Sequence, residues 1–387
     1  MNSRSWHSRV AKQIGSIALV SVLIVLAGCT RIREWRESRR VEEARRELAS
    51  LEPIDAHTHI STNAPAFLAM LEGLHMHVMD ILYVDDTSPY RTSLEQQRQD
   101  ALKFIASSHG LAKLCTTFDP FQLHDADFAQ KAVAALNDDF ANGAVGFKVW
   151  KNIGMEVKLS GTQYLMPDAP VLTPIYRDAS AHNKTLIIHA ADPNGAWSSR
   201  FPGGQGAKYY AAHPEWNMSK IAGAPSKEAI LESRDHLLES NPDLRVIGAH
   251  LGSDEDHLDE LARRLDRFPN LAVDTAARIV NLTLQPRETV RAFLIKYQDR
   301  VLYGSDLSFS AADRSEETSR SWMRQYLLDW RYFSSDDKFS YWGRQVEGLA
   351  LPPSVLKKIY HDNAVVWLPG IGGGPNEFPG PASRHAP

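Results

Sequence analysis

The sequence predicts an α/β protein built as a closed (β/α)8 barrel, the architecture also called a TIM barrel. Short apolar runs typical of buried strands alternate with helical patterns along most of the chain. Eight such runs occur, which is the number of strands that this barrel requires. A doubly wound open sheet also alternates, but it usually carries a glycine-rich turn after its first strand, and none follows the first run here.

The elements follow one another in a regular order. The expected strands are 53–57, 78–84, 112–117, 145–150, 185–189, 245–250, 271–274 and 301–304. The expected helices between them are 65–74, 94–108, 127–142, 173–182, 227–240, 255–268 and 286–297.

Two intervals are longer than the rest. Segment 190–226 is rich in aromatic residues and glycine, and such loops after barrel strands often form lids or substrate walls. We therefore expect it to contact substrate, with Trp197 as a candidate. Segment 306–351 is expected to form helices that cover the barrel.

The N-terminal segment is predicted to be a bacterial lipoprotein signal peptide, residues 1–28. Positive charges precede an apolar run at 14–27, which is too short to span a bilayer comfortably. The ending Leu26-Ala27-Gly28-Cys29 resembles a lipobox, which implies cleavage before Cys29 and lipid attachment to it. A plain signal peptide or an uncleaved anchor is the alternative. Because Thr30 follows Cys29, the resemblance favours the periplasmic side of the outer membrane in the cell envelope.

The remaining boundaries follow from composition. Residues 29–51 carry the lipidated cysteine and a charged helical tether, although a basic stretch that contacts acidic head groups is an alternative. The barrel domain spans 52–368, and a tail rich in glycine and proline spans 369–387. The only other cysteine, Cys115, lies in an apolar strand and is expected to be buried, so no cysteine-based metal site is possible.

The overall charge argues against a nucleic-acid partner. The net charge is −4, with 43% hydrophobic and 23% charged residues, which is typical of a globular protein without a basic patch. The partners we expect are a small-molecule substrate and, through the lipid, a membrane. A homo-oligomer is compatible with the sequence, which leaves the oligomeric state open.

Residues that bind metals occur where strands end. His57 and His59 are two apart on the first strand, so both rings point to the same side. Later strands end in further polar residues: Lys148, His189, His250 and Asp306. In a barrel these ends meet at one face, where burying several polar groups is costly without a shared partner. We therefore expect a divalent cation there, Zn²⁺ or another transition metal.

Several segments resemble, in order, the signatures of the amidohydrolase superfamily. They are 54–59, 188–189, 248–252 and 303–306. Segment 359–364 resembles the closing segment of the branch that includes aminocarboxymuconate semialdehyde decarboxylase and dicarboxylate lactonases. The similarity extends over most of residues 52–368 and implies an amidohydrolase-like barrel.

The resemblance implies that His57, His59, His189 and Asp306 bind metal. It gives His250 two possible roles, polarising the substrate or binding a second metal. Lys148 aligns with a lysine that carries a carboxyl group and bridges two metals in binuclear members. The alternative is a free ammonium that pairs with Asp306 or contacts substrate, so one metal and two metals both stay open.

Roles for the other residues follow from their chemistry. Asp306 is expected to take a proton from water and return it to the leaving group, and His250 to donate a hydrogen bond to a developing oxyanion. Asp55 is expected to orient a ligand. Arg278 is a candidate clamp for a substrate carboxylate, with a surface ion pair as the alternative. Lys151 has the opposite strand parity to Lys148 and is expected to point away from the barrel axis.

These features predict a metal-dependent hydrolase acting on a lactone, ester or amide, with a carboxylate-bearing substrate. The alternative is a metal-dependent decarboxylase that removes CO2 from an unsaturated or aromatic acid without oxidation. A third possibility is a surface lipoprotein whose barrel binds a ligand without catalysis. Substrate identity cannot be read from the sequence, because the loops carry no diagnostic motif.

Overall fold

The structure is a computed structural model that describes residues 37–85, 92–198 and 205–372. Cys29, the predicted signal peptide and most of the predicted tail lie outside the described residues. The chain divides into two compact units, Met1–Leu48 and Ala49–Pro387. The described part of the first unit is helical. No helix among the described residues is both long and apolar enough to cross a membrane.

The second unit contains a curled parallel sheet in the order β10-β9-β8-β7-β4-β3-β2-β1-β11. The strands are β1 (Ile54–Ile60), β2 (His77–Ile81), β3 (Ala112–Thr117), β4 (Gly146–Val149), β7 (Thr185–Ile188), β8 (Val246–Gly248), β9 (Leu271–Asp274), β10 (Val301–Leu302) and β11 (Leu307–Phe309). All eight predicted strands are present, within a few residues of their expected bounds.

The sheet closes because β10 and β11 are two pieces of one strand. β10 pairs with β9 on one side, and β11 pairs in parallel with β1 on the other. Between the two pieces, Ala56 N donates to Tyr303 O over 3.0 Å, and Asp306 N donates to His57 O over 2.8 Å. Counting β10 and β11 as one gives eight strands in a ring, which confirms the predicted (β/α)8 barrel.

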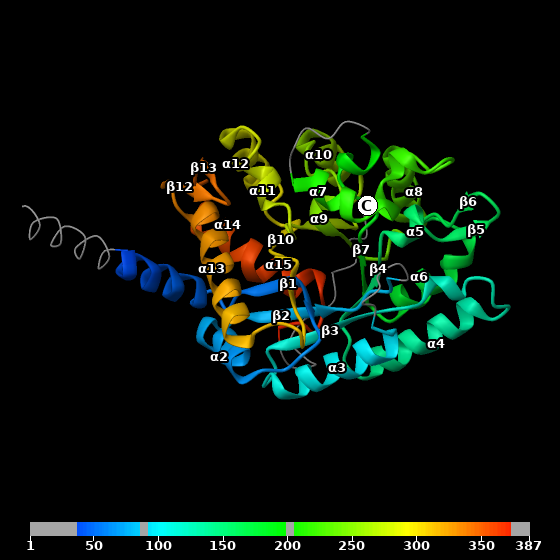
Figure 1. Ribbon diagram of the computed structural model, residues 1–387, viewed down its shortest axis with the longest axis horizontal. Helices are drawn as coiled ribbons and strands as arrows, with labels where there is room; N and C mark the ends of the chain where they lie inside the picture. Colours follow the sequence, from blue (N-terminus) through cyan, green and yellow to red (C-terminus); the bar gives the residue numbers. More distant parts are fainter. Residues whose placement is uncertain (1–36, 86–91, 199–204, 373–387) are drawn as a thin grey trace, which may run out of the picture. The chain divides into compact units, whose positions relative to one another are not determined.

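The helices lie outside the strands (Figure 1). Each predicted helix is present: α2 (Pro65–Leu74), α3 (Leu94–Ser107), α4 (Phe128–Ala141), α6 (Thr173–Ala181), α8 (Lys227–Ser240), α10 (Leu258–Arg267) and α12 (Arg287–Lys296). Their apolar sides pack on the sheet, as the helical periodicity requires.

Four further elements interrupt this alternation. After strand eight, α13 (Ser315–Ser334) is followed by the hairpin β12–β13 (Lys338–Tyr341 and Arg344–Glu347), where only helices were expected. A second hairpin, β5–β6 (Lys158–Ser160 and Gln163–Tyr164), follows β4, and α7 (Gln205–Ala212) lies in the long aromatic segment after β7.

The core fills the barrel and one of its ends. Inward side chains such as Ile187, Ile247 and Leu302 form one cluster with Trp367 and Ile371 from the C-terminal segment. Cys115 belongs to the same cluster and is fully buried, as expected. Ile371 lies in the segment assigned to the tail, so the packed domain extends beyond residue 368.

Candidate metal centre

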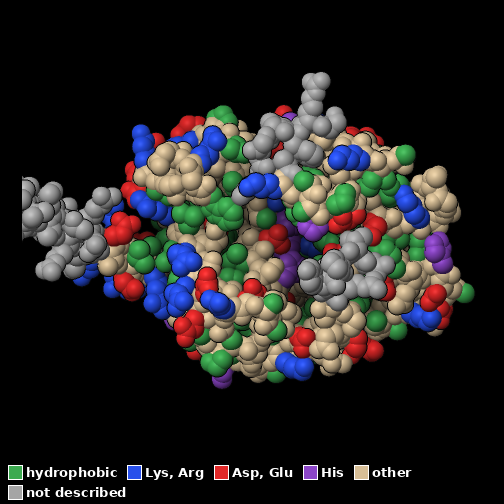
Figure 2. All heavy atoms as spheres, in the orientation of Figure 1, with side chains coloured by type: hydrophobic (Ala, Val, Ile, Leu, Met, Phe, Trp, Pro, Cys, Tyr) green, Lys and Arg blue, Asp and Glu red, His purple; other side chains and the backbone are tan. Residues whose placement is uncertain are grey.

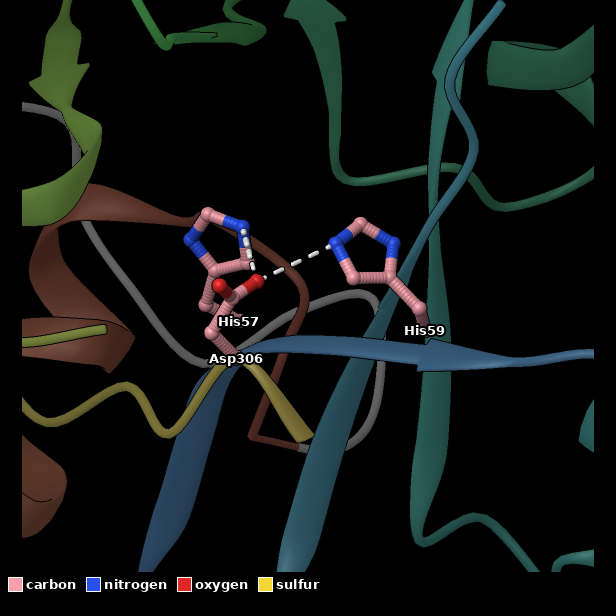
Figure 3. Close-up of side chains that lie close together, drawn as sticks. All are labelled: His57, His59 and Asp306. Atoms are coloured by element: carbon pink, nitrogen blue, oxygen red, sulfur yellow. Dashed lines mark ion pairs between the residues drawn. The ribbon is translucent and has the colours of Figure 1, made fainter. Parts of the chain in front are cut away.

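Strand β1 brings two imidazoles to the open end of the barrel. The pairing of β1 with β2 shifts register between Asp55 and Thr58, and a shift of this kind re-aims the side chains that follow it. His57 is 1% exposed and His59 lies nearer the surface. The structure therefore brings His57 and His59 together, as the sequence predicted (Figure 3).

The hydrogen bonds of the two rings fix which nitrogen faces the site. His59 Nδ1 lies 2.8 Å from the carbonyl oxygen of Ile81, and because a carbonyl only accepts, Nδ1 carries the proton. His57 Nδ1 lies 2.8 Å from Asp274 Oδ2, which accepts in the same way. In the neutral rings both Nε2 lone pairs are therefore free to bind a cation.

Asp306 provides the third group. Its Oδ1 lies 3.5 Å from His57 Nε2 and 3.4 Å from His59 Nε2 (Figure 3). Burial opposes ionisation of this carboxyl, but the surrounding histidines outweigh it and hold its pKa well below the usual range. Asp306 has a left-handed backbone (φ 64°), which costs roughly 1 kcal/mol. A side chain at Gly304 would lie 3.0 Å from His57 Cβ, so any residue other than glycine would press on His57.

A divalent transition metal fits this donor set. Ligands about 2.0 Å from a tetrahedral zinc ion lie about 3.3 Å apart, close to the two distances between Asp306 and the histidines. Within the described residues, His57, His59 and Asp306 are the one group whose ligand atoms lie close enough together to hold an ion.

Three other expected ligands surround this group without joining it. Lys148 is fully buried, with Nζ 3.3 Å from His57 Nε2, and burial lowers its pKa. The His250 ring lies 4.9 Å from the His57 ring and 4.3 Å from the His189 ring. His189 Nε2 has no hydrogen-bond partner in the described structure and faces Asp192 Oδ1 at 3.3 Å. Burial lowers the pKa of His189 to about 4.

The orientation of His250 bears on its expected role. Its Nδ1 lies 2.9 Å from Ala276 O, so Nδ1 carries the proton and Nε2 carries the lone pair in the neutral ring. Burial holds the pKa of His250 well below its usual value. His250 can therefore donate from Nε2 only after it has itself been protonated.

Asp274 links these histidines and was missed in the sequence. Its Oδ2 accepts from His57 Nδ1, and its Oδ1 accepts from the backbone N–H groups of His250 (2.8 Å) and Ala276 (3.1 Å). As the last residue of β9, it could have been found by the strand-end reasoning that found the other site residues.

Asp55, by contrast, does not orient a histidine side chain. Its Oδ2 accepts from Ser305 Oγ (2.5 Å) and from Tyr326 of α13 (2.9 Å), and its Oδ1 accepts from Ser305 N. Its Oδ1 also accepts from His57 N over 3.1 Å, so Asp55 contacts the backbone of His57 and the residue before Asp306.

The side chains of the metal centre line a cavity of about 820 Å³. Figure 2 shows histidine side chains in a hollow of this face. The cavity lining includes the six site residues already named: His57, His59, Lys148, His189, His250 and Asp306. Its further walls include Tyr83, Trp150, Lys151, Asp192, Tyr209, Tyr210, Arg278, Val280 and Leu284.

The two expected substrate contacts differ in position. Arg278 lines the cavity, its Nε is buried without a partner among the described residues, and its Nη1 donates only to Ala277 O. Trp197 is not among the lining residues, and its indole N–H donates to Pro225 O over 2.8 Å. Trp197 therefore contributes to the packing of the segment after β7.

Lys151 lies in the cavity wall, contrary to expectation. β4 ends at Val149, so strand parity no longer applies at position 151. Lys151 is 3% exposed, and its Nζ donates to Asp192 Oδ2 (2.8 Å) and Tyr209 OH (3.0 Å). Burial favours a neutral Asp192, but Lys151 outweighs it and holds the pKa of that carboxyl below the usual value.

The chain is similar to known proteins both in sequence and in fold. A family model described as amidohydrolase matches residues 54–369. No match was found among the curated proteins. An uncharacterised TIM-barrel protein from Bordetella bronchiseptica is 13% identical, with 83% of this chain and 99% of that chain covered and a TM-score of 0.49. 2,6-Dihydroxybenzoate decarboxylase from Rhizobium is also 13% identical (81% and 98%, TM-score 0.43). Dihydroorotase from Campylobacter jejuni is 13% identical as well (81% and 82%, TM-score 0.41).

Proposed function

The chain belongs to the amidohydrolase family, and on that premise we propose that it is a metal-dependent hydrolase of a lactone, ester or amide. The observation that carries the proposal is the convergence of two oriented imidazoles on one ionised carboxylate, His57, His59 and Asp306. A divalent cation bound there supplies Lewis acidity, which polarises a carbonyl oxygen and acidifies water near neutral pH.

Asp306 is proposed as the general base and acid. Because its pKa is held low, it is ionised at neutral pH and can accept a proton from attacking water. The same carboxyl then returns the proton to the leaving oxygen or nitrogen. His250 carries its proton on Nδ1, which donates to Ala276 O, so its Nε2 does not compete to donate at rest.

Arg278 is proposed to bind a carboxylate of the substrate. The Arg278 guanidinium lies on the cavity wall with its Nε buried and without a partner among the described residues, and its N–H donors match a carboxylate. The aromatic rings of Tyr83 and Trp150, with centroids 5.2 Å apart and planes tilted by 45°, add an apolar part of the wall that an unsaturated acid can contact. The substrate is thus expected to be a small acid with one reactive carbonyl.

Decarboxylation of an unsaturated or aromatic acid is the second candidate. It is compatible with the one three-residue ligand group among the described residues, because one metal suits either reaction whereas a bridged pair suits hydrolysis. Lys148 lies beside His57, where a carboxylated lysine could bridge two metals, so a binuclear centre is the alternative to a single metal.

One experiment separates these candidates. Metal-loaded protein is offered a panel of lactones and esters, with proton release recorded, and a panel of hydroxybenzoate-like acids, with CO2 release recorded. Hydrolysis that falls by orders of magnitude in Asp306→Asn, with metal still bound, supports the proposal. CO2 release alone supports the lyase, and ligand binding without turnover on either panel supports the non-catalytic barrel.

A further inference from the structure

The backbone that carries His250 is wound in the less favourable direction. His250, Leu251, Gly252 and Ser253 have φ angles of 59°, 56°, 62° and 65°, which together make a left-handed turn directly after β8. Only glycine adopts this conformation freely, and three of the four residues are not glycine. Contacts from elsewhere in the fold must therefore hold the turn in place.

The turn decides where the His250 imidazole points. It folds back onto its own strand so closely that a side chain at Gly248 would lie 2.8 Å from Gly252 Cα. In this conformation His250 Nδ1 reaches Ala276 O, and the ring lies between those of His57 and His189. If the turn relaxed toward right-handed geometry, this placement would be lost.

Two side chains hold the turn through hydrogen bonds to its backbone. At its first residue, Asp274 Oδ1 accepts from His250 N over 2.8 Å. At its third, Arg234 of α8 donates from Nη1 to Gly252 O over 2.5 Å. Arg234 is 0% exposed, and Asp235 Oδ1 accepts from its Nε (3.1 Å) and Nη2 (2.8 Å). A buried guanidinium is costly unless each partner is present, so the bond to Gly252 is a fixed part of this cluster.

We propose that Arg234 is a positioning residue for the metal centre. It is not among the residues that line the cavity, and it acts by holding the Gly252 carbonyl and, through it, the turn that orients His250. The inference rests on the proposed function only where turnover is measured.

Arg264 of α10 offers a matched control. It is 7% exposed and belongs to the same buried cluster, where its Nε donates to Asp235 Oδ2 (3.0 Å) and its Nη1 to Asp254 Oδ1 (3.2 Å). In the described structure its hydrogen bonds go to side chains and none goes to a carbonyl of the turn. Arg264→Met therefore removes a guanidinium from the cluster but leaves the bond to Gly252 intact.

The test compares backbone hydrogen exchange across residues 246–256 in the full chain and in Arg234→Met, Arg234→Lys and Arg264→Met. Because a hydrogen bond to a charged group is lost, the amides of His250, Ser253 and Asp254 should exchange about tenfold faster in Arg234→Met. In Arg264→Met the amides of His250 and Ser253 should stay near the wild-type rate; Asp254 is left out of this comparison, because Arg264 binds its side chain. Arg234→Lys, which keeps a donor for Gly252 O, should recover part of the protection.

A second readout uses turnover. In Arg234→Met, kcat should fall about tenfold with KM little changed, Arg234→Lys should restore part of kcat, and Arg264→Met should keep most of it. Equal exchange in Arg234→Met and Arg264→Met overturns the proposal. If Arg234→Met does not fold, Arg234→Lys must still differ from Arg264→Met in exchange, and equality there also overturns it. Exchange needs no substrate, so its outcome is independent of whether the proposed reaction is correct.

Discussion

At the scale of single residues, one carboxylate connects most of the site. Asp274 fixes the proton of His57 on Nδ1 with one oxygen and holds the backbone of His250 and Ala276 with the other. Both oxygens must accept, which an aspartate can do and an asparagine cannot. The chemistry of His57 and the backbone position of His250 are thus coupled through one side chain.

Asp274→Asn should therefore weaken metal binding by about 10–100-fold. One of the two carboxylate oxygens is replaced by an NH2 group, which would face an N–H donor instead of accepting from it. The measurement is competition between the protein and a chelator of known affinity. Asp329→Asn is a matched control, since Asp329 is equally buried but lies in another cluster. Unchanged affinity in Asp274→Asn would show that the carboxylate does not support His57.

The direction of a side chain could be predicted from the sequence where the residue lies within a regular strand. His57 and His59 share one strand, so their convergence follows from strand periodicity alone. The same rule failed for Lys151, because β4 ends two residues earlier. Such local breaks in a strand leave no clear pattern in the sequence.

At the scale of elements, α13 supports the bend that carries Asp306. Its Tyr326 donates to Asp55, which in turn accepts from both the backbone and the hydroxyl of Ser305. On the same helix, Asp329 accepts from Tyr303, Tyr341 and Gln325. The helix is thus tied to β1 through Tyr326 and to strand eight through Asp329, which accepts from the Tyr303 hydroxyl.

The Asp329 cluster makes stability depend on pH. Burial raises the pKa of Asp329 to about 6, so between pH 4 and pH 6 the folded chain keeps a proton that the unfolded chain releases. The free energy of unfolding should therefore fall as pH rises through this window, by up to about 3 kcal/mol.

Asp329→Asn cannot titrate and should lack this component. Denaturant unfolding of the wild type and of Asp329→Asn at pH 4 and pH 7 measures the difference directly, because all other titrating groups are shared. The same change with pH in both proteins would mean that Asp329 is ionised in the folded state throughout this range.

At the scale of the whole molecule, the barrel could be predicted because alternation is a long-range pattern that local errors do not disturb. Eight strands and seven helices were found within a few residues of their bounds. The hairpins β5–β6 and β12–β13 were missed because each is short and lies where an inserted segment has no fixed period. The split of strand eight was also missed. β10 pairs with β9 and β11 pairs with β1, and pairing between segments so far apart in the chain leaves no local pattern.

The N-terminal segment leads to a separate prediction. If Cys29 is lipidated as its sequence context predicts, Cys29→Ser should abolish labelling by radioactive palmitate and move the expressed full chain from the membrane fraction to the soluble one, because the predicted acceptor thiol is removed. Cys115→Ala, which changes the other cysteine, should keep both properties. Labelled protein in the Cys29→Ser variant would place the lipid elsewhere.

His57, His59 and Asp306 are proposed to hold one divalent cation together, and the metal content per chain measures whether they do. After loading with Zn²⁺ and dialysis, the wild type should retain at least one equivalent by elemental analysis. His57→Ala/His59→Ala should lose it while remaining folded by circular dichroism. A wild type that retains no metal, or a double variant that retains as much as the wild type, would contradict the account.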